Sequence, residues 1–375
     1  MELFCIRKPC VWIDVLVVLF WLGLTSCVSR AHSSDTTKSE IPSFQSSFPN
    51  LPIGAAIKYS YLNPSEPHYA LLRHFGALVF ENDMKQESIQ PVEGYFNFKR
   101  ADDLVAYAEQ NGKKLRGHTL VWHNQVPAWF FQSSSDKSKP ATKEELLSRM
   151  ETHIRTLVGR YKGKIDSWDV VNEVVDDSGK LRDSKYLQIV GSEEYIADAF
   201  RWAHETDPDA ELFINDYNLE YKGPKQNYMY DLVKRLLEQG VPINGVGLQC
   251  HITIMRPRVD EIRGAIERFA SLGLKVQVTE LDMSVYTSSS EKKKIPDQGI
   301  LMKQATRYKD LFTMFEQEAE AGRLDMVMFW GVADDGTWLN NFPVYGRADY
   351  PLLFGKDFKP KPAFWAIVDP SHLSE

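Results

Sequence analysis

Residues 142–173 read TKEELLSRMETHIRTLVGRYKGKIDSWDVVNE, and they contain one helix followed by one strand. Thr142 and Glu145 have the spacing of a capping box, which predicts that a helix begins here. The apolar side chains that follow recur at helical spacing. The next apolar run, Ile165–Val171, is short and bounded by polar residues, as is typical of a buried strand. It ends in the polar pair Asn172–Glu173.

The same helix and strand pattern repeats along the chain from about Leu51. One further helix is followed by Asn111–Gly112, a usual C-terminal cap. The predicted strands are Ile53–Ile57, Ala77–Phe80, Leu115–Trp122, Ile165–Val171, Glu211–Asn215, Gly245–His251, Val276–Leu281 and Met326–Trp330. Eight strand–helix units predict an α/β fold in which a parallel sheet closes into a single (β/α)8 TIM barrel.

The composition favours one large globular domain. The 375 residues are 43% hydrophobic and 25% charged, which is ordinary, and the formal net charge is -7. An acidic chain lacks the basic face that sequence-independent binding to nucleic acid or anionic lipid needs, so we expect no nucleic-acid partner. The 9 Trp, 16 Tyr and 20 Phe exclude a disordered, low-complexity chain. No change in composition divides residues 50–372, which we assign to the barrel.

The N-terminal residues 1–27 are typical of a signal peptide. Two basic residues precede the uncharged run Val15–Val28, which as a helix would span about 21 Å, less than the roughly 30 Å core of a bilayer. Leu24–Cys27 also resembles the bacterial lipoprotein signal, in which the cysteine is lipidated. An ordinary cleavage site near Ala31 is the alternative. Residues 28–49 are Ser-rich and polar, and we assign them to a linker.

The four cysteines agree with export. Cys5 and Cys10 would leave with the signal peptide, and Cys27 would leave or carry lipid, so that only Cys250 remains in the barrel. A single cysteine forms no internal disulfide, and the core alone must then stabilise the protein. We expect a secreted protein, or one held at the cell surface by a lipid on Cys27, its only membrane contact.

Polar and aromatic residues gather after the predicted strands, at the end where such barrels carry their chemistry. His118 and Trp122 share one side of a regular strand. Gln249 and His251 do the same. Asn172–Glu173 are adjacent, so both reach the barrel mouth only if the strand ends or bulges there.

Glu173 after the fourth strand and Glu280 after the seventh form the candidate catalytic pair. Glycoside hydrolysis needs two carboxyl groups that flank the glycosidic bond, one protonated to assist departure and one ionised to attack or to activate water. A lone glutamate at a strand end is more often a solvated or salt-bridged group. The tryptophans around both, and Asn172 beside one, favour catalysis.

Three histidines, His118, His123 and His251, are also compatible with a metal site. His123 falls on the other side of a regular strand from His118, and no two-carboxylate cluster accompanies them. We therefore favour a histidine that orients a carboxylate, and we predict no metal and no cofactor. Nucleotide-binding loops and a Gly-x-Ser-x-Gly elbow are not found in the sequence.

Trp122, Trp330 and Trp338 lie at strand ends among polar residues, which favours a platform for stacking sugars over a place in the core. Tyr217 lies in a polar turn, and its role stays open between the two.

Five motifs resemble those of the family 10 glycoside hydrolases, the endo-1,4-β-xylanases: WDVVNE at 168–173, TELD at 279–282, HTLVWH at 118–123, ENDMK at 81–85 and Gln249-x-His251. The closing segments FWGVADDGTWLNNFPV, PLLF and KPKPAF resemble the family's eighth strand and last helix. The similarity covers roughly residues 50–370 in unbroken order. WDVVNE alone occurs in several related barrel hydrolases, but the whole set in this order is specific, and a bacterial source is expected.

The resemblance implies a retaining endo-xylanase. Glu173 matches the family's general acid/base and Glu280 its nucleophile. Asn172 matches the residue that binds the 2-hydroxyl of the attacked sugar. His251 matches the partner that orients the nucleophile, with Gln249 beside it.

The resemblance also implies a set of sugar-binding residues. Those that match the non-reducing-side subsites are Glu81, Asn82, Lys85, His118 and Trp122. Trp330 and Trp338 match the hydrophobic wall over them, and Tyr217 matches an aromatic residue near the cleavage point. The expected partner is xylan or xylo-oligosaccharides, bound by a monomer.

Two departures from the family pattern affect the substrate detail. Gln86 stands where the family commonly has a tryptophan, and Phe75–Val79 lacks the Asn and Thr often seen before the ENxMK motif. Three other functions remain as alternatives: an endo-β-glucanase of a related barrel family, a metal-dependent barrel hydrolase, and a catalytically dead carbohydrate-binding barrel.

Overall fold

A computed structural model describes residues 41–373 of the chain. The predicted signal peptide and residues 28–40 of the predicted linker lie outside the described residues. Residues from Pro42 onward form one compact unit.

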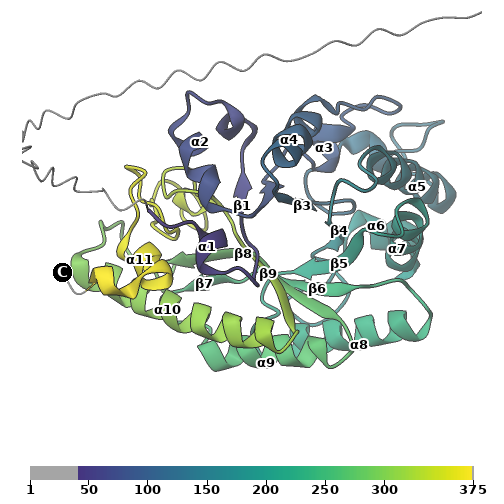
Figure 1. The fold of residues 1–375 in the computed structure, drawn as a ribbon. Coiled ribbons are helices and arrows are strands. Elements are labelled where there is room, and N and C mark those ends of the chain that lie inside the picture. Colours follow the sequence, from purple (N-terminus) through teal and green to yellow (C-terminus); the bar gives the residue numbers. More distant parts are fainter. Residues whose placement is uncertain (1–40, 374–375) are drawn as a thin grey trace, which may run out of the picture. The chain divides into compact units, whose positions relative to one another are not determined.

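Eight parallel strands form a closed barrel at the centre of this unit (Figure 1). Strands β1 to β6 pair in chain order, β6 pairs with β8, β8 with β9, and β9 with β1, which closes the ring. The bounds are β1 Ile53–Ile57, β2 Ala77–Phe80, β3 Lys114–Gly117, β4 Ser167–Asn172, β5 Glu211–Asp216, β6 Gly245–Leu248, β8 Lys275–Ser284 and β9 Leu324–Phe329. A short strand, β7 (His251–Thr253), pairs with the end of β8. The predicted (β/α)8 barrel is confirmed.

Helices surround the barrel (Figure 1). They are α1 Phe44–Ser47, α2 Pro67–Leu71, α3 Gln86–Ile89, α4 Lys99–Gln110, α5 Lys143–Arg160, α6 Lys185–Val190, α7 Glu194–Thr206, α8 Pro224–Glu238, α9 Val259–Ala270, α10 Gln298–Glu320 and α11 Pro362–Val368. The predicted capping box of α5 is present, because the Thr142 hydroxyl accepts from the Glu145 N–H while the Glu145 carboxylate accepts from the Thr142 N–H. Among the helices of residues 41–373, none is both long and apolar enough to cross a bilayer.

Two predicted strands end earlier than expected. β3 stops at Gly117, and β6 stops at Leu248. After each end the backbone leaves regular strand geometry, and Cys250 has a left-handed φ of 57°. The premise of a regular strand therefore does not hold for the residues that follow, although the two pairs it placed at the barrel mouth, His118 with Trp122 and Gln249 with His251, do line the cleft.

Strand β4 both bulges and ends near the adjacent pair Asn172–Glu173, which is the condition for both side chains to reach the barrel mouth. The pairing of β4 with β5 shifts register between Asp169 and Val171, which is a β-bulge, and the strand ends at Asn172. Glu173 then adopts a left-handed φ of 58°. The bulge and the turn let both side chains of the pair reach the same space.

The N-terminal boundary of the barrel lies before the predicted one. Residues 43–49, which we expected in the linker, include helix α1 and pack on the barrel unit. Phe44 is fully buried, with its ring 5.3 Å from those of Phe75 and Phe364. The large apolar area that this ring buries explains why a Ser-rich segment becomes part of the fold.

Candidate active site

A cleft of about 880 Å³ opens where the barrel strands end. All of the side chains that the sequence predicted for the site line it: Glu81, Asn82, Lys85, His118, Trp122, Asn172, Glu173, Tyr217, Gln249, His251, Glu280, Trp330 and Trp338. The structure therefore brings these residues together, while their individual roles stay predictions.

Glu280 lies within β8 and is only 5% exposed. Its Oε1 accepts a hydrogen bond of 2.9 Å from Asn215 Nδ2, and its Oε2 lies 3.2 Å from His251 Nε2. Burial alone raises the pKa of the Glu280 carboxyl. The hydrogen bond from His251 and the proximity of His118 outweigh burial, so that this pKa lies below its usual value. Glu280 is therefore ionised at neutral pH.

His251 connects Glu280 to a second carboxylate. Its Nδ1 lies 3.0 Å from Asp282 Oδ2, on the side of the ring opposite Glu280. Burial lowers the pKa of His251, but Asp282 and Glu280 together raise it well above the usual value. The same Asp282 oxygen accepts from the indole N–H of Trp338 at 2.8 Å. A protonated imidazole is thus held between two carboxylates, with its ring plane fixed.

Glu173 lies just past the end of β4, with its side chain 15% exposed. Its Oε1 is 3.3 Å from Gln249 Nε2 and 3.4 Å from Asn172 Nδ2. The nearest histidine is His123, whose Nε2 is 4.0 Å from Glu173 Oε2. Burial, with the charges of Arg182 and Lys225, lowers the pKa of His123 to about 4, so its ring is neutral at neutral pH.

Amide side chains link the two candidate carboxylates. Asn215 Nδ2 donates both to Glu280 and to Asn172 Oδ1, and Asn172 Nδ2 in turn contacts Glu173. Thr279 Oγ1 donates to Asn215 Oδ1 at 2.6 Å, which fixes the orientation of that amide. Asn215 has room because Gly247 has no side chain, and a Cβ there would overlap with Asn215 Oδ1. The chain of amides places both carboxylates in one connected site.

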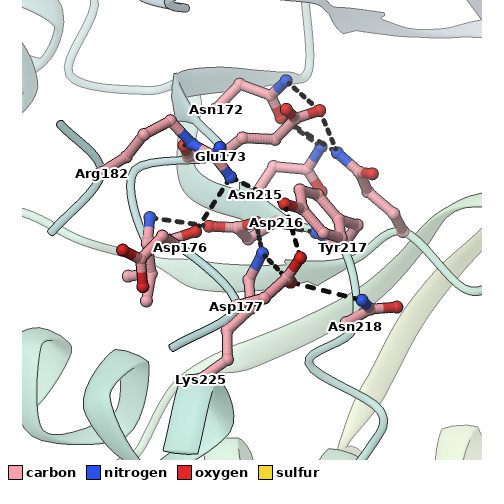
Figure 2. A network of polar contacts seen from close by, with 12 residues as sticks. Asn172, Glu173, Asp176, Asp177, Arg182, Asn215, Asp216, Tyr217, Asn218 and Lys225 are labelled. Carbon is pink, nitrogen blue, oxygen red and sulfur yellow. Dashed lines mark hydrogen bonds and ion pairs between the residues drawn. The ribbon is translucent and has the colours of Figure 1, made fainter. Parts of the chain in front are cut away.

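The backbone at Glu173 is held by a loop arginine, as Figure 2 shows. Arg182 Nε donates to the Glu173 carbonyl at 2.6 Å, and its Nη2 donates to the Val175 carbonyl and to Tyr217 Oη at 2.9 Å. A non-glycine residue with positive φ is strained. Arg182 therefore fixes a strained turn at the point where Glu173 leaves the strand.

Tyr217 lines this side of the cleft. Lys225 Nζ lies 3.1 Å from the centre of its ring and 2.7 Å from Asp216 Oδ1. Burial raises the pKa of Asp216 to about 7, against the opposing effect of Lys225. Since Lys225 covers one ring face and Tyr217 lines the cleft, the tyrosine is held as an aromatic surface for a ligand.

Another part of the cleft is built on the segments after β2 and β3. Lys85 Nζ donates to Asn82 Oδ1 at 2.9 Å and to Gln125 Oε1 at 2.8 Å. It also lies 4.6 Å from the centre of the Trp122 ring. Burial lowers the pKa of Lys85, against the surrounding glutamates, of which Glu280 and Glu81 contribute most. This group of donors beside an aromatic ring can bind the hydroxyls of a sugar.

A buried polar pair underlies this region. His118 Nδ1 lies 2.9 Å from Asp169 Oδ2, and both residues are almost fully buried. Arg116 donates to the other Asp169 oxygen and to Gln277. His118 is thereby oriented from inside the barrel, and its ring meets the edge of Trp330 at 5.2 Å.

The loops after β9 supply an aromatic wall. Trp330 lies 6.4 Å from the His251 ring, and Trp338 lies 4.9 Å from it. Phe342 stacks on Trp338 at 4.8 Å with an angle of 19° between the rings, and it is 55% exposed. The three rings form an apolar surface beside polar groups, as in sugar-binding sites.

His123 and Gln86 differ from expectation. The expectation that His123 points away from the cleft was wrong, because the segment that carries it is not a regular strand and His123 lines the cleft. Gln86 is buried outside the cleft lining, and its Oε1 accepts from Tyr186 at 2.9 Å. In residues 41–373, no group of three or more His, Cys, Asp or Glu side chains is arranged to hold a metal ion.

Several functional residues were missed in the sequence. Asp282, Asp169 and Arg182 each hold a cleft residue in place. The histidines that Asp282 and Asp169 hold lie far away in the chain, whereas Glu173 lies nine residues before Arg182 in a loop without a periodic pattern. Asp282 had a usable signal, because it falls on the same side of β8 as Glu280. Gln125 and Phe342 lie in loops, where no periodic pattern identifies a binding residue.

Comparison with known proteins gives one family. The sequence model of glycosyl hydrolase family 10 matches residues 43–370. Endo-1,4-beta-xylanase C of Paenibacillus barcinonensis is 49% identical over 333 residues, covering 86% of this chain and 31% of that protein. Exoglucanase XynX of Acetivibrio thermocellus is 50% identical over 344 residues, covering 90% of this chain and 30% of that protein. The chain spans less than a third of the length of these two relatives.

Solved structures agree with the barrel. The structure of a GH10 protein from Paenibacillus barcinonensis has a TM-score of 0.88 at 48% identity, covering 89% of this chain and 99% of that one. A xylanase from Thermoanaerobacterium saccharolyticum, described as intracellular and solved with xylotetraose, has a TM-score of 0.81 at 49% identity. The match covers 88% of this chain and 99% of the xylanase chain.

Proposed function

Because the chain belongs to glycosyl hydrolase family 10, we propose that it is an endo-1,4-β-xylanase, which hydrolyses internal β-1,4-xylosidic bonds of xylan. A relative named as an endo-1,4-β-xylanase supports this activity, and the xylotetraose complex of a similar structure supports a xylo-oligosaccharide as ligand. One observation carries the proposal: Glu173 and Glu280 line the same cleft in different surroundings.

The proposed mechanism is double displacement. Glu280 attacks the anomeric carbon while Glu173 gives its proton to the departing glycosidic oxygen, which leaves a covalent glycosyl-enzyme. Glu173, now ionised, takes a proton from a water molecule that attacks the same carbon. Breaking the bond to Glu280 then restores both residues, and the product keeps the anomeric configuration of the substrate.

The surroundings of the two glutamates support this division of roles. Glu280 contacts a protonated histidine, and its lowered pKa keeps it ionised as a nucleophile requires. Glu173 lies beside the neutral His123 and is more exposed, so it has access to the water of the second step. Asn172, between them, is placed to bind a hydroxyl of the attacked sugar.

The cleft walls suggest how the polysaccharide is bound. We assign the non-reducing-side sugars to the polar group after β2 and β3, which comprises Glu81, Asn82, Lys85, His118 and Trp122. Trp330 and Trp338 would cover these sugars, and Tyr217 would contact the substrate near the cleavage point. Xylose lacks the hydroxymethyl arm of glucose, so a bulky ring such as Trp330 would exclude glucose more than xylose.

The decisive experiment is product analysis with the purified protein. On linear xylo-oligosaccharides we expect internal cleavage, with the new reducing end first appearing as the β-anomer in a proton NMR time course. First appearance of the α-anomer would indicate inversion and would remove Glu280 as a nucleophile. A protein that binds xylan without cleaving it would be a carbohydrate-binding barrel, and loss of cleavage with chelator would indicate a metal-dependent hydrolase.

The alternative is an endo-β-glucanase. The 50% identity to a protein named exoglucanase XynX favours testing it. Rates on xylan, mixed-linkage glucan and carboxymethylcellulose separate the two functions. We expect xylan to be cleaved fastest, and equal rates on xylan and carboxymethylcellulose would contradict the exclusion by Trp330.

We also propose that the protein is exported, because its N-terminal sequence is typical of a signal peptide. Cell fractionation tests export. Metabolic labelling with a fatty acid, compared between the natural chain and a Cys27→Ser variant, separates a secreted protein from a lipid-anchored one. The expected monomer is checked by light scattering.

A further inference from the structure

Arg347 lies in the long loop after β9 and lines the cleft, although it is only 5% exposed. Ser288 and Ser289, from the loop after β8, line the cleft with it. Arg347 Nη1 donates to the Ser288 carbonyl at 2.9 Å, and its guanidinium lies 4.0 Å from the centre of the Tyr286 ring. These contacts hold the side chain against the cleft wall.

The charge of Arg347 has no counter-charge in the described part of the chain. Within residues 41–373 it forms no ion pair, and its buried Nε has no hydrogen-bond partner. Two acidic groups of the segments around Arg347 are already engaged. Asp349 accepts from Ser284 Oγ and from the Val285 N–H, while Glu291 pairs with a lysine and accepts from the backbone of its own loop. A buried cation with unfilled donors is costly unless a ligand supplies the missing anion.

Other cationic side chains of the cleft differ from Arg347. Lys85 donates to Asn82 and Gln125, and Arg182 donates to two carbonyls and to Tyr217. Both therefore already have acceptors among the protein groups, and Lys85 lies within the polar group assigned to the sugars. A guanidinium presents five N–H donors in a planar fork, and Arg347 uses one of them. Its remaining Nη donors can bind a planar anion, whereas the Nε–H is buried.

We propose that Arg347 binds the carboxylate of an acidic substituent on the xylan backbone, such as a glucuronic acid branch. The inference rests on the proposed function and narrows its substrate class. Arginine forms two parallel hydrogen bonds with a carboxylate, which gives both strength and orientation. Glu280 belongs to β8, and the loop after β8 helps to hold Arg347. The acidic branch would therefore be recognised on the wall that continues from the strand of the nucleophile.

The test compares two substrates that differ in one group. One is a xylo-oligosaccharide with a single glucuronic acid branch, and the other is the same compound with the branch carboxyl reduced to an alcohol. For the natural chain we expect kcat/KM to be about tenfold higher on the acidic compound. This is the ratio that one hydrogen bond to a charged group would produce. Equal values on the two compounds would contradict the proposal without any variant.

Variants then assign the preference to Arg347. Arg347→Gln should bring the ratio of the two kcat/KM values close to one, mainly through a higher KM for the acidic compound. Arg347→Lys should keep part of the preference. Arg256→Gln, which removes an exposed arginine outside the cleft, should keep the ratio of the natural chain. If the ratio survives in Arg347→Gln, another group binds the carboxylate and the proposal is wrong.

Binding gives an answer that does not depend on cleavage. Calorimetry with the Glu280→Ala variant measures affinity for both compounds, and the acidic one should bind about tenfold more tightly. Tighter binding of the acidic compound by a protein that cleaves no xylan would refute the proposed function while supporting the site. Cleavage of xylan with no difference between the two compounds would refute the site alone.

Discussion

Glu280 and Glu173 are held in place by different parts of the molecule. The partners of Glu280 are Asn215 on β5 and His251 on β7, so the nucleophile candidate is fixed by strands of the sheet. Glu173 stands beyond its strand, and its backbone is held by Arg182 from the loop between β4 and α6. One carboxylate is thus part of the barrel, and the other depends on a loop.

The two glutamates also differ in the charge of the histidine beside them. Glu280 contacts the protonated His251, whereas Glu173 stands 4.0 Å from the neutral His123. A group that must stay ionised benefits from a fixed cation. A group that must gain and lose a proton is better placed beside a neutral ring with access to water. The comparison therefore explains why two identical side chains can carry different roles.

The largest effect is expected for Glu280→Ala. If Glu280 is the nucleophile, as proposed, its loss should lower kcat on xylo-oligosaccharides on the order of 10⁵-fold, as for other covalent catalysts. Glu220→Gln is the matched control, because Glu220 is also buried, with its pKa raised by burial to about 7, but does not line the cleft. Its turnover should match the natural chain. Unchanged turnover in Glu280→Ala, with circular dichroism showing a folded protein, would remove the assignment.

The next effect is expected for Glu173→Ala. Removing the proposed general acid should lower kcat on xylo-oligosaccharides by about 10²- to 10⁴-fold. The loss should be much smaller on an aryl xylobioside with a nitrophenyl group, because such a leaving group departs without a proton. Equal losses on the two substrates would show that Glu173 is not the general acid. The contrast between its surroundings and those of Glu280 would then not explain the catalytic roles.

Asp282→Asn tests whether the protonated His251 keeps Glu280 ionised. Without the Asp282 charge, the pKa of His251 falls, and the pKa of Glu280 rises as its cationic partner is lost. Because Glu280 must be ionised, the acidic limb of the kcat/KM profile should move to higher pH. A shift of about one to two pH units would lower activity about 10- to 100-fold at a pH on that limb, with a much smaller change at neutral pH.

The control for this variant is Asp335→Asn, which alters a second aspartate–histidine pair. Asp335 lies 3.1 Å from His68 Nε2 and does not line the cleft. Its pH profile should overlay that of the natural chain. A profile of Asp282→Asn that also overlays it would mean that His251 does not set the ionisation of Glu280.

The smallest effect is expected for Arg182→Lys. A lysine cannot reach the two carbonyls and Tyr217 together, so the turn at Glu173 should loosen. We expect kcat to fall about two- to tenfold with little change in KM, the size of one or two lost hydrogen bonds. The effect should be confined to substrates that need the acid. An equal loss on the nitrophenyl substrate would place the role of Arg182 in general stability.

The sequence predicted what depends on local patterns. The capping box at Thr142 and the strands β1 and β2 are encoded by neighbouring residues, and their bounds agree with the structure. The ends of β3 at Gly117 and of β6 at Leu248 could not be predicted from the sequence, because the backbone geometry there is set by packing between strands. For this reason the alternation of side chains in a regular strand gave the wrong side for His123, which lines the cleft.

The site could be predicted as a set of residues but not as a network. Each predicted side chain follows a strand, and the topology of a barrel brings strand ends together. The partners that set ionisation and orientation could not be recognised. Asp169 lies within the WDVVNE motif, but nothing in that motif shows that it pairs with His118, and Arg182, which holds Glu173, lies in a loop segment with no motif of its own. Arg347 was missed for the same reason, since an arginine without a counter-charge can be recognised only when its surroundings are known.

The burial of Phe44 determines how short the chain can be made. Its ring contacts those of Phe75, Phe329 and Phe364, which come from both ends of the barrel sequence. A truncated protein that starts at residue 50, where the strands begin, would leave this aromatic pocket open to water. The smallest unit that keeps its thermal stability should therefore start before Ser43, and trimming by a protease from the N-terminus should stop at that point.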